Sequence, residues 1–270
     1  MENLFDVQDK VILLTGGCGI LASSMARYFA AKGAKIVVLD RLEDKGNELV
    51  AELKAKGGEA AFFYCDVLKK EVLEKCREDI LALYGRIDVL VNAAGGNQAG
   101  ATIAPDQTFF DLDMKAFGGV MNLNLIGTVL PTQVFAVPMT KQGKGVILNM
   151  SSETSLRPLT RVVGYGCAKS SINSFTKFMA GELAIKFGEG LRVNAIAPGF
   201  FLTTQNRELM TNPDGSPSDR CQKIVAHTPF GRLGQPEELL GTIHWLISDA
   251  SAFVTGVVVP IDGGFDAFSI

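Results

Sequence analysis

Short apolar runs alternate with longer segments of helical periodicity along this chain. The run "KVILLT" precedes "ASSMARYFAAKG", "KIVVLD" precedes "EDKGNELVAELKAKG", and "AAFFYCDV" precedes "KEVLEKCREDILALYG". Runs such as "IVVL" are apolar at successive positions, so both faces of these strands are expected to be buried under helices. The alternation therefore predicts an α/β fold, a doubly wound Rossmann-type parallel sheet of about seven strands with helices on both faces.

The alternation continues to "GVVVPID" near the C-terminus without a linker, repeat or low-complexity tract. Chains of 270 residues commonly form one α/β domain, so residues 1–270 are expected to form a single dinucleotide-binding domain. Two segments break the rhythm, near residues 96–113 and 200–234, and each follows an expected strand. Open α/β sheets bind ligands at the carboxyl ends of their strands, so both segments are predicted substrate loops.

Charge and cysteine content narrow the classes of partner. A formal net charge of -3 gives no long-range attraction to phosphate backbones or anionic lipid, so neither nucleic acid nor a membrane is an expected partner. The five cysteines are scattered without a CxxC pair, which predicts neither a disulfide framework nor a metal site and fits a reducing cytoplasm. The N-terminal "MENLFDVQDK" lacks the apolar core of a signal peptide, and no later segment is expected to reach the length of apolar sequence that spans a bilayer.

The stretch "TGGCGILA" joins the first expected strand to the first helix. It fits the pattern G-x-G-x-x-A, in which Gly17 makes the tight turn, Gly19 lets a phosphate approach and Ala22 packs helix on strand. Backbone N–H groups at the start of the helix would then hold a pyrophosphate. A strand-to-helix loop without a ligand is the alternative that this stretch alone leaves open.

Asp40 ends the second strand, twenty-one residues after Gly19. An acidic side chain at this offset accepts hydrogen bonds from a ribose 2′-hydroxyl and repels a 2′-phosphate, so NAD is favoured over NADP. Arg41, the next residue, can pair with a phosphate and keeps NADP as the less favoured option.

Tyr165 and Lys169 stand four residues apart in "YGCAK" and share one face of a helix. Free tyrosine has a pKa of about 10, so a tyrosine that moves protons at neutral pH needs a cation that favours the phenolate. Lys169 can supply that charge. Ser151 and Ser152 follow the strand "GVILNM", and either hydroxyl can steady a substrate oxygen.

With these motifs the sequence resembles the short-chain dehydrogenase/reductase family along nearly its whole length. The resemblance rests on "TGGCGILA", Asp40, "CDV", "VNAAG", "NLIGT", "NMSS", "YGCAK", "PGFFLT", "GRLGQPEEL" and "FVTGVVVPIDGG". One departure is that Ile20 and Ala22 stand where the family's usual TGxxxGxG has glycines. The resemblance implies an NAD(P)-dependent oxidoreductase and a homo-oligomer, either a tetramer or a dimer.

The resemblance also implies a role for each residue of the site. In the family a serine lies thirteen residues before the tyrosine, which selects Ser152 over Ser151. Tyr165 would transfer the proton, and Lys169 would lower its pKa and bind the nicotinamide ribose. Ser152 would orient the substrate oxygen, and Asn124 would hold a water relay. The implied cofactor-binding residues are Gly16, Gly17, Gly19, Ile20, Asp40, Asp66, Val67, Asn92, Ala93, Gly95, Tyr165, Lys169, Pro198, Gly199 and Thr203.

A narrower resemblance concerns the predicted substrate loops. The phrases "GGNQAGAT", "RPLTRVVGY", "PGFFLTTQNR" and "IVAHTPFGRLG" are similar to the branch of D-mannonate oxidoreductases, which interconvert D-mannonate and D-fructuronate. Their polar side chains suit a polyhydroxy carboxylate. The predicted substrate-binding residues are Asn97, Ser152, Arg157, Arg161 and Arg207, and Gln98, Gln205, Asn206 and His227 add further polar groups. Each arginine has the alternative of being a solvated or acid-paired loop residue.

These observations favour an NAD-dependent oxidoreductase that transfers hydride between nicotinamide and a sugar acid, D-mannonate or D-fructuronate. Within the enzyme class, the alternative is another polyol, sugar or 3-oxoacyl substrate. From a different class comes a scaffold that binds NAD without turnover. The joint presence of Asn124, Ser152, Tyr165 and Lys169 disfavours the scaffold, because a protein that only binds needs no proton relay.

Overall fold

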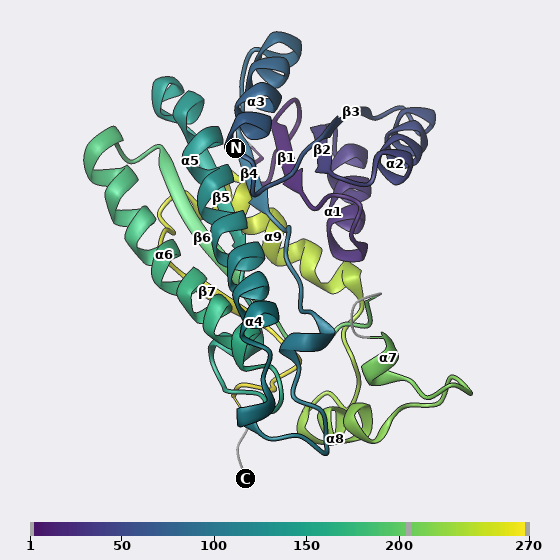
Figure 1. The fold of residues 1–270 in the computed structure, drawn as a ribbon. Coiled ribbons are helices and arrows are strands. Elements are labelled where there is room, and N and C mark those ends of the chain that lie inside the picture. Colours follow the sequence, from purple (N-terminus) through teal and green to yellow (C-terminus); the bar gives the residue numbers. More distant parts are fainter. Residues whose placement is uncertain (1–2, 204–206, 268–270) are drawn as a thin grey trace.

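The computed structural model describes residues 3–203 and 207–267. Its centre is one sheet of seven parallel strands in the order β3-β2-β1-β4-β5-β6-β7 (Figure 1). The strands are β1 (Val11–Thr15), β2 (Lys35–Asp40), β3 (Glu59–Tyr64), β4 (Val89–Asn92), β5 (Gly145–Met150), β6 (Leu191–Pro198) and β7 (Val258–Ile261). The predicted doubly wound parallel sheet of about seven strands is confirmed.

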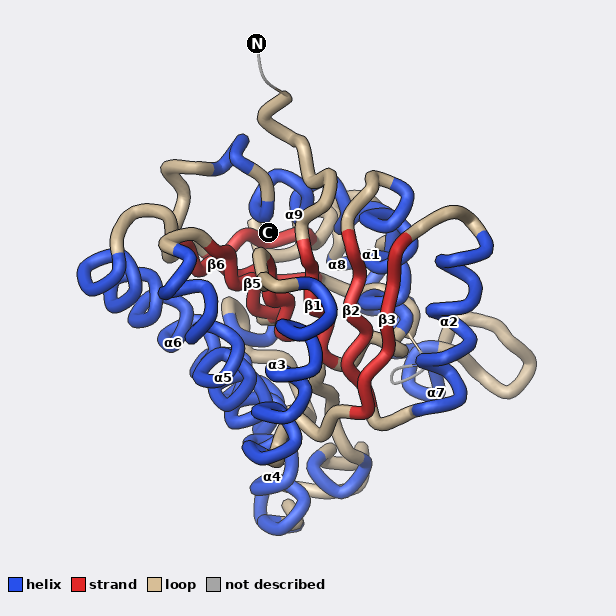
Figure 2. The backbone as a smooth tube through the Cα atoms, turned by 90° about the horizontal axis from the view of Figure 1, so that it is seen from above, coloured by secondary structure: helices blue, strands red, loops and turns tan. Residues whose placement is uncertain are grey.

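Helices cover both faces of the sheet, as the view from above shows (Figure 2). One face carries α1 (Ile20–Ala31), α2 (Glu43–Ala55) and α9 (Leu240–Ile247). The other face carries α3 (Lys70–Tyr84), α5 (Gly127–Gln142) and α6 (Val163–Phe187). The shorter helices are α4 (Met114–Met121), which leads into α5, and α7 (Arg207–Met210) and α8 (Asp219–His227), which follow β6.

Alternating side chains of each central strand supply two separate cores. In β1, Ile12 and Leu14 pack with α1, α2 and α9, whereas Val11 and Leu13 pack with α3, α5 and α6. Successive side chains of a strand point to opposite faces, so a strand buried on both faces needs an unbroken apolar run. This requirement explains why the strands could be read from continuous apolar segments.

The carboxyl ends of the central strands meet at one edge of the sheet. Thr15 at the end of β1 pairs with Asn92 at the end of β4, and Asn92 pairs with Asn149 of β5. The strand order reverses at β1, because the chain first winds toward β3 and then returns to β4 on the other side. Such a reversal leaves a crevice for ligands outside the carboxyl ends.

A buried line of amide and hydroxyl groups crosses the sheet below this edge. Asn92 Nδ2 donates to Thr132 Oγ1 of α5 and to Asn149 Oδ1, both at 2.9 Å. Asn149 Nδ2 donates in turn to Thr176 Oγ1 of α6 at 2.9 Å. All four side chains are at most 1% exposed, so these bonds fix α5 and α6 to the sheet where no water can replace them.

The helical run Met114–Gln142 comprises α4, a π turn (Asn122–Ile126) and α5. Its most apolar window has a mean hydropathy of 1.4, and the run is long enough to span a membrane. The expectation that no later segment reaches that length and composition is therefore wrong for this run. Half of the window is buried, and Val134, Phe135 and Met139 pack against the sheet. Burial in the protein core accounts for its apolar character.

Candidate active site

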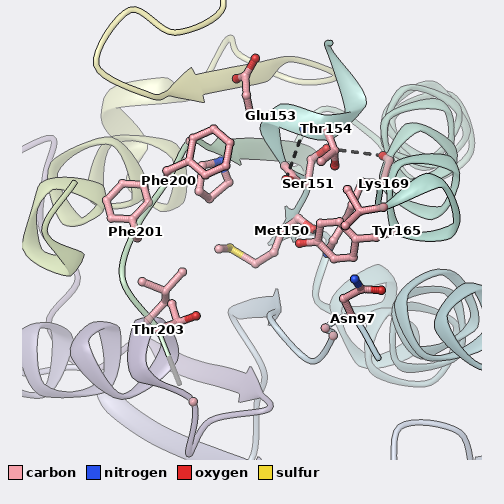
Figure 3. A pocket seen from close by; sticks show the side chains of 18 of the residues that line it. Asn97, Met150, Ser151, Glu153, Thr154, Tyr165, Lys169, Phe200, Phe201 and Thr203 are labelled. Carbon is pink, nitrogen blue, oxygen red and sulfur yellow. Dashed lines mark hydrogen bonds between the residues drawn. The ribbon is translucent and has the colours of Figure 1, made fainter. Parts of the chain in front are cut away.

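A cavity of about 270 Å³ lies at the carboxyl edge of the sheet, beside the β1–α1 turn. Figure 3 shows Tyr165 and Lys169 on one side of it, Phe200 and Phe201 on the other, and Met150 between them. Its wall is formed by residues at the ends of β5 and β6, at the starts of α1 and α6, and in the first turn of α8. The cavity therefore lies where the strand order predicts a ligand site.

The β1–α1 turn presents backbone to this cavity. Gly16 has a φ of +61°, in the left-handed region, and its carbonyl accepts a hydrogen bond from Gly19 N at 3.0 Å. A Cβ on Gly16 would lie 2.8 Å from the Cα of Ala94, so space and conformation both require glycine. Gly19 is the N-cap of α1, whose first N–H groups have no acceptor within the helix. The turn thus fits a phosphate-bearing ligand.

Asp40 ends β2 as expected, and its carboxylate is tied to the glycine turn. Oδ2 accepts from Cys18 N at 3.0 Å, and Oδ1 accepts from Leu42 N at 3.1 Å. The carboxylate is partly exposed and lies outside the cavity wall, behind the turn. In dinucleotide sites this position faces the adenosine ribose.

Tyr165 and Lys169 lie on one face of the first turns of α6, and both line the cavity. Lys169 is 4% exposed, and its Nζ lies 5.4 Å from the centroid of the Tyr165 ring. The same Nζ donates to the carbonyl oxygen of Met150 at 2.7 Å, which fixes the ammonium group at the end of β5. Ser152 completes the group, since it lines the same cavity and lies near enough to the Tyr165 phenol to lower its pKa.

The two candidate serines are used differently. Ser151 Oγ is buried and donates to Asn173 Oδ1 at 2.5 Å, and it lies 2.9 Å from Ser155 Oγ. Ser151 thus joins the end of β5 to α6. Among the described residues, the contact of this kind made by Ser152 Oγ is a long hydrogen bond that it accepts from Thr154 N at 3.4 Å. The geometry therefore agrees with the family spacing in making Ser152 the hydroxyl available to a substrate.

Burial shifts the pKa of both ionisable groups. It raises the pKa of the Tyr165 phenol, and the hydrogen bond from Ser152 opposes this rise. It lowers the pKa of Lys169 to about 7. Burial of the phenol is the larger of the two effects, so the pKa of Tyr165 lies above its ordinary value. The phenol therefore keeps its proton at pH 7 and is ready to donate it.

Asn124, in the π turn, is fully buried and holds the backbone opposite Lys169. Its Nδ2 donates to Gly96 O at 2.7 Å and Val120 O at 2.8 Å, and its Oδ1 accepts from Gly96 N at 3.1 Å. A Cβ on Gly95 would lie 2.6 Å from this Oδ1 and 3.5 Å from Lys169 Nζ. Both amide hydrogens and one lone pair of the amide oxygen are used within the protein, so the side chain positions residues 95–96.

The other predicted cofactor residues divide between the cavity wall and its supports. In the wall lie Gly16, Gly19, Ile20, Ala93, Gly95, Pro198, Gly199 and Thr203. Outside it lie Gly17, Asp40, Asp66, Val67 and Asn92. A Cβ on Gly17 would come 2.8 Å from Val38 Cγ1, so this glycine lets the turn pack on β2. Asn92 belongs to the buried polar line.

Among the predicted substrate residues, Asn97 and Ser152 line the cavity and the three arginines do not. Arg157 Nε pairs with Asp266 Oδ1 at 2.9 Å. Arg161 Nε donates to the carbonyl of Ile103 at 2.7 Å. Arg207 begins α7 and is exposed. His227 packs edge-on against Phe265, and Gln205 and Asn206 lie outside the described residues.

Polar residues that the sequence did not single out complete the wall. Glu153 and Thr154 directly follow Ser152, and Arg220 lies in the first turn of α8. In the part of the chain that the structure describes, neither Glu153 oxygen meets a hydrogen-bond donor and Thr154 Oγ1 has no partner. Burial and the charges of Asp262 and Asp266 raise the pKa of Glu153 to about 7. Its side chain points away from Tyr165 (Figure 3).

A sequence signal for Arg220 existed. Cys221 and Ile224, three residues apart in the predicted loop 200–234, are the buried face of α8. That spacing predicts a short helix whose adjacent residues flank the buried face. The residue beside the buried face that lines the cavity is determined by the way α8 packs on the rest of the protein. No local sequence pattern predicts that packing.

Comparisons with known proteins agree with this geometry. Residues 19–266 match the family described as enoyl-(acyl carrier protein) reductase. The uncharacterized oxidoreductase UxuB of Bacillus subtilis (strain 168) is 46% identical over 270 residues, 96% of both chains. A structure from Haemophilus influenza with bound NAD, provisionally described as a D-mannonate oxidoreductase, has a TM-score of 0.91 at 40% identity and covers 99% of both chains. A gluconate 5-dehydrogenase from Burkholderia cenocepacia J2315, with NADP and tartrate, has a TM-score of 0.88 at 30% identity and covers 98% of both.

The relatives and the site lead to the same family. Gly16, Gly19 and Gly95 line the cavity with backbone, and Gly16 and Gly95 leave no room for a Cβ, a cradle that fits the NAD(P) held by similar proteins. Ser152, Tyr165 and Lys169 stand beside it in the positions that the family motifs assign. The chain belongs to the short-chain dehydrogenase/reductase family of oxidoreductases.

Proposed function

We propose that the protein is an NAD-dependent oxidoreductase that transfers hydride between nicotinamide and a sugar acid, with D-fructuronate reduced to D-mannonate as its reaction. The observation that carries this proposal is that Ser152, Tyr165 and Lys169 line one cavity, with Lys169 Nζ 5.4 Å from the centroid of the Tyr165 ring. A protein that only binds a nucleotide has no need for such a group.

The residues divide the chemistry of carbonyl reduction among them. Nicotinamide, when bound, supplies the hydride. The Tyr165 phenol, protonated at neutral pH, donates its proton to the carbonyl oxygen as that oxygen gains negative charge. The Ser152 hydroxyl holds the same oxygen, and the Asn124 amide keeps residues 95–96 in place beside Lys169. Oxidation needs the phenolate, so the reverse rate is expected to rise with pH while reduction proceeds at neutral pH.

NAD is the proposed cofactor because of Asp40. Its carboxylate stands behind the glycine turn, where it would accept bonds from a ribose 2′-hydroxyl and repel a 2′-phosphate. The similar structure from Haemophilus influenza holds NAD, and the less similar gluconate 5-dehydrogenase holds NADP. The site residues, on this proposal, belong to one dinucleotide-binding domain.

A sugar acid is the proposed substrate because the cavity carries unpaired polar groups. Among the described residues, Asn97 Oδ1 and Thr154 Oγ1 lack a partner, and both residues line the wall. Substrate hydroxyls would supply the missing donors. The names of two similar proteins, a D-mannonate oxidoreductase and a gluconate 5-dehydrogenase, refer to related hexonates.

A homo-oligomer in the cytoplasm is the proposed setting. The α6 side chains Phe178 and Ile185, seven residues apart on one face, are 64% and 86% exposed, and a second copy of the chain would cover them. All five cysteines are free thiols, which suits a reducing compartment.

The test is a panel of carbonyl substrates assayed by NADH or NADPH oxidation with purified protein. The competing substrate classes are represented by four compounds: D-fructuronate, 5-keto-D-gluconate, D-fructose and an acetoacetyl thioester. The proposal expects the highest kcat/KM for D-fructuronate with NADH, and a 3-oxoacyl preference would contradict it. Binding of NADH without turnover of any member would support the scaffold instead.

A further inference from the structure

Arg220 differs from most arginines of the described chain in its partners. Five others, Arg27, Arg86, Arg157, Arg192 and Arg232, each meet a carboxylate or several carbonyls. Arg220 is half-buried, yet its two contacts, to Oγ1 and O of Thr160, are both 3.4 Å long. Good N–H···O bonds are about 2.7–3.2 Å long, so these are weak. Within residues 3–203 and 207–267, no carboxylate pairs with Arg220.

The fold holds Arg220 in the wall of the catalytic cavity. The N-cap of α8, Ser218, accepts a hydrogen bond from Cys221 N at 3.2 Å, which fixes the turn that carries Arg220. Cys221 and Ile224 are buried in an apolar cluster that also includes Leu159. Leu159 belongs to the loop between Ser152 and α6, so one packing contact positions Arg220 and the catalytic loop together.

A second arginine stands beside it. Arg161 has a φ of +76°, in a region that side-chain-bearing residues rarely occupy. Its carbonyl accepts from Ile103 N at 2.9 Å and its Nε donates to Ile103 O at 2.7 Å, which holds this conformation. Burial, and then the charge of Arg161, lower the pKa of Arg220. Two neighbouring cations in a half-buried place repel each other unless an anion joins them.

We propose that Arg220, supported by Arg161, is the anchor for the substrate carboxylate and the main determinant of preference for sugar acids over neutral sugars. This inference rests on the proposed function. A guanidinium offers two parallel N–H groups that match a carboxylate, and an incoming carboxylate would also relieve the repulsion between the two arginines. A hexonate that reacts at carbon 5 carries its carboxylate at the far end of its chain. The anchor on α8 and the proton donor on α6 would hold the two ends of one substrate.

The test compares D-fructuronate with D-fructose, the ketose that has a hydroxymethyl group in place of the carboxylate. The variant is Arg220→Gln, and the matched control is Lys223→Gln, which removes an exposed cation from the same helix. A lost hydrogen bond to a charged group corresponds to about a 10- to 100-fold decrease in kcat/KM for D-fructuronate. For D-fructose, and for the control variant with either substrate, changes within about threefold are expected.

Further variants separate the contribution of each arginine. Arg220→Lys keeps the charge and loses the planar fork, so an intermediate loss is expected. Arg161→Gln should cost less than Arg220→Gln, and the double variant less than the product of the two losses, because both arginines act on one carboxylate. NADH affinity, measured by fluorescence, reports whether each variant is folded, and Arg220→Lys carries the test if Arg220→Gln does not fold.

The outcomes distinguish this inference from the proposed function. If the wild-type enzyme prefers D-fructuronate and Arg220→Gln keeps that preference, the anchor is overturned and the proposed function stands. If the wild-type enzyme shows no preference for the uronate over D-fructose, both are overturned.

Discussion

The two sides of the cavity are built in different ways. On the cofactor side, Gly16, Gly19 and Gly95 expose main chain at strand ends that the sheet register holds in place. On the substrate side, side chains such as Arg220 extend from short elements that pack in a small cluster apart from the two main cores. Backbone geometry tolerates few substitutions, whereas loop side chains can be exchanged on the same scaffold. Substitutions on the cofactor side should therefore weaken NADH binding, whereas substitutions on the substrate side should alter the choice of substrate.

The largest effect is expected where the two sides meet. Tyr165→Phe keeps the ring and removes the proton donor, so kcat should fall by at least about 100-fold. The Kd for NADH should stay within about threefold, because the glycine turn is untouched. Tyr84→Phe, in α3 and away from the cavity, is the control and should keep full activity. Near-normal turnover by Tyr165→Phe would show that another group donates the proton.

A change confined to the cofactor side should act through the backbone. In Gly95→Ala the new Cβ would lie 2.6 Å from Asn124 Oδ1, so the 95–96 segment must move, and the Kd for NADH should rise by at least about tenfold. Gly118→Ala is the matched control, because nothing lies within 4 Å of its added Cβ and alanine favours the helix by about 0.5–1 kcal/mol. Equal NADH affinity in the two variants would mean that the close contact at Gly95 has no consequence for binding.

A milder change on the same side should alter the choice of cofactor and leave the substrate side intact. Asp40→Ser removes the charge that repels a 2′-phosphate, so the ratio of kcat/KM for NADH over NADPH should fall by roughly tenfold. The KM for the sugar acid should stay unchanged. Wild-type enzyme that uses NADPH as well as NADH would contradict the role given to Asp40.

The smallest effect is expected on the substrate side, in stability. The pKa of Glu153 is raised to about 7 in the folded protein, so the folded state binds more protons than the unfolded state from about pH 4.5 to 7. Its contribution to stability is therefore complete at low pH and lost as pH rises through 7. Glu153→Gln should raise the free energy of unfolding at pH 8 by about 1–3 kcal/mol, with the gain shrinking toward pH 5.

Thermal unfolding at pH 5 and pH 8 measures this difference. The exposed acid Glu189 offers a control, since Glu189→Gln should leave Tm nearly unchanged at both values. A Glu153→Gln variant less stable than the wild type at pH 8 would show that the buried carboxylate has a partner that stabilises its charged form.

Much of the fold and the cofactor side could be predicted from the sequence because their signals are local. The strands appear as apolar runs, and the Tyr165–Lys169 pair is set by the helical repeat. The substrate side depends on contacts between distant segments. The sequence makes Arg157 a candidate for binding the substrate carboxylate, but in the structure it pairs with Asp266, 109 residues later in the chain. Arg220 lies in the cavity wall because of the way α8 packs on the apolar cluster beneath it. No local pattern encodes such a pairing.

The buried polar line across the sheet has a direction. The Thr176 hydroxyl gives its only hydrogen to Ile172 O, so it must accept from Asn149, whose carbonyl must then accept from Asn92. On the other side, the Thr132 hydroxyl gives its hydrogen to a backbone carbonyl of α5 and also accepts from Asn92. One arrangement of protons satisfies every hydrogen bond along the line, and the Asn92 NH2 group is its source, with one hydrogen for each side. The Asn92 carbonyl oxygen itself has no partner among the described residues. A carboxylate at this position would supply neither, and lone pairs would face lone pairs in both directions. The Asn92 amide thus holds the helix that follows the π turn directly, and it holds the catalytic helix α6 through the Asn149 amide.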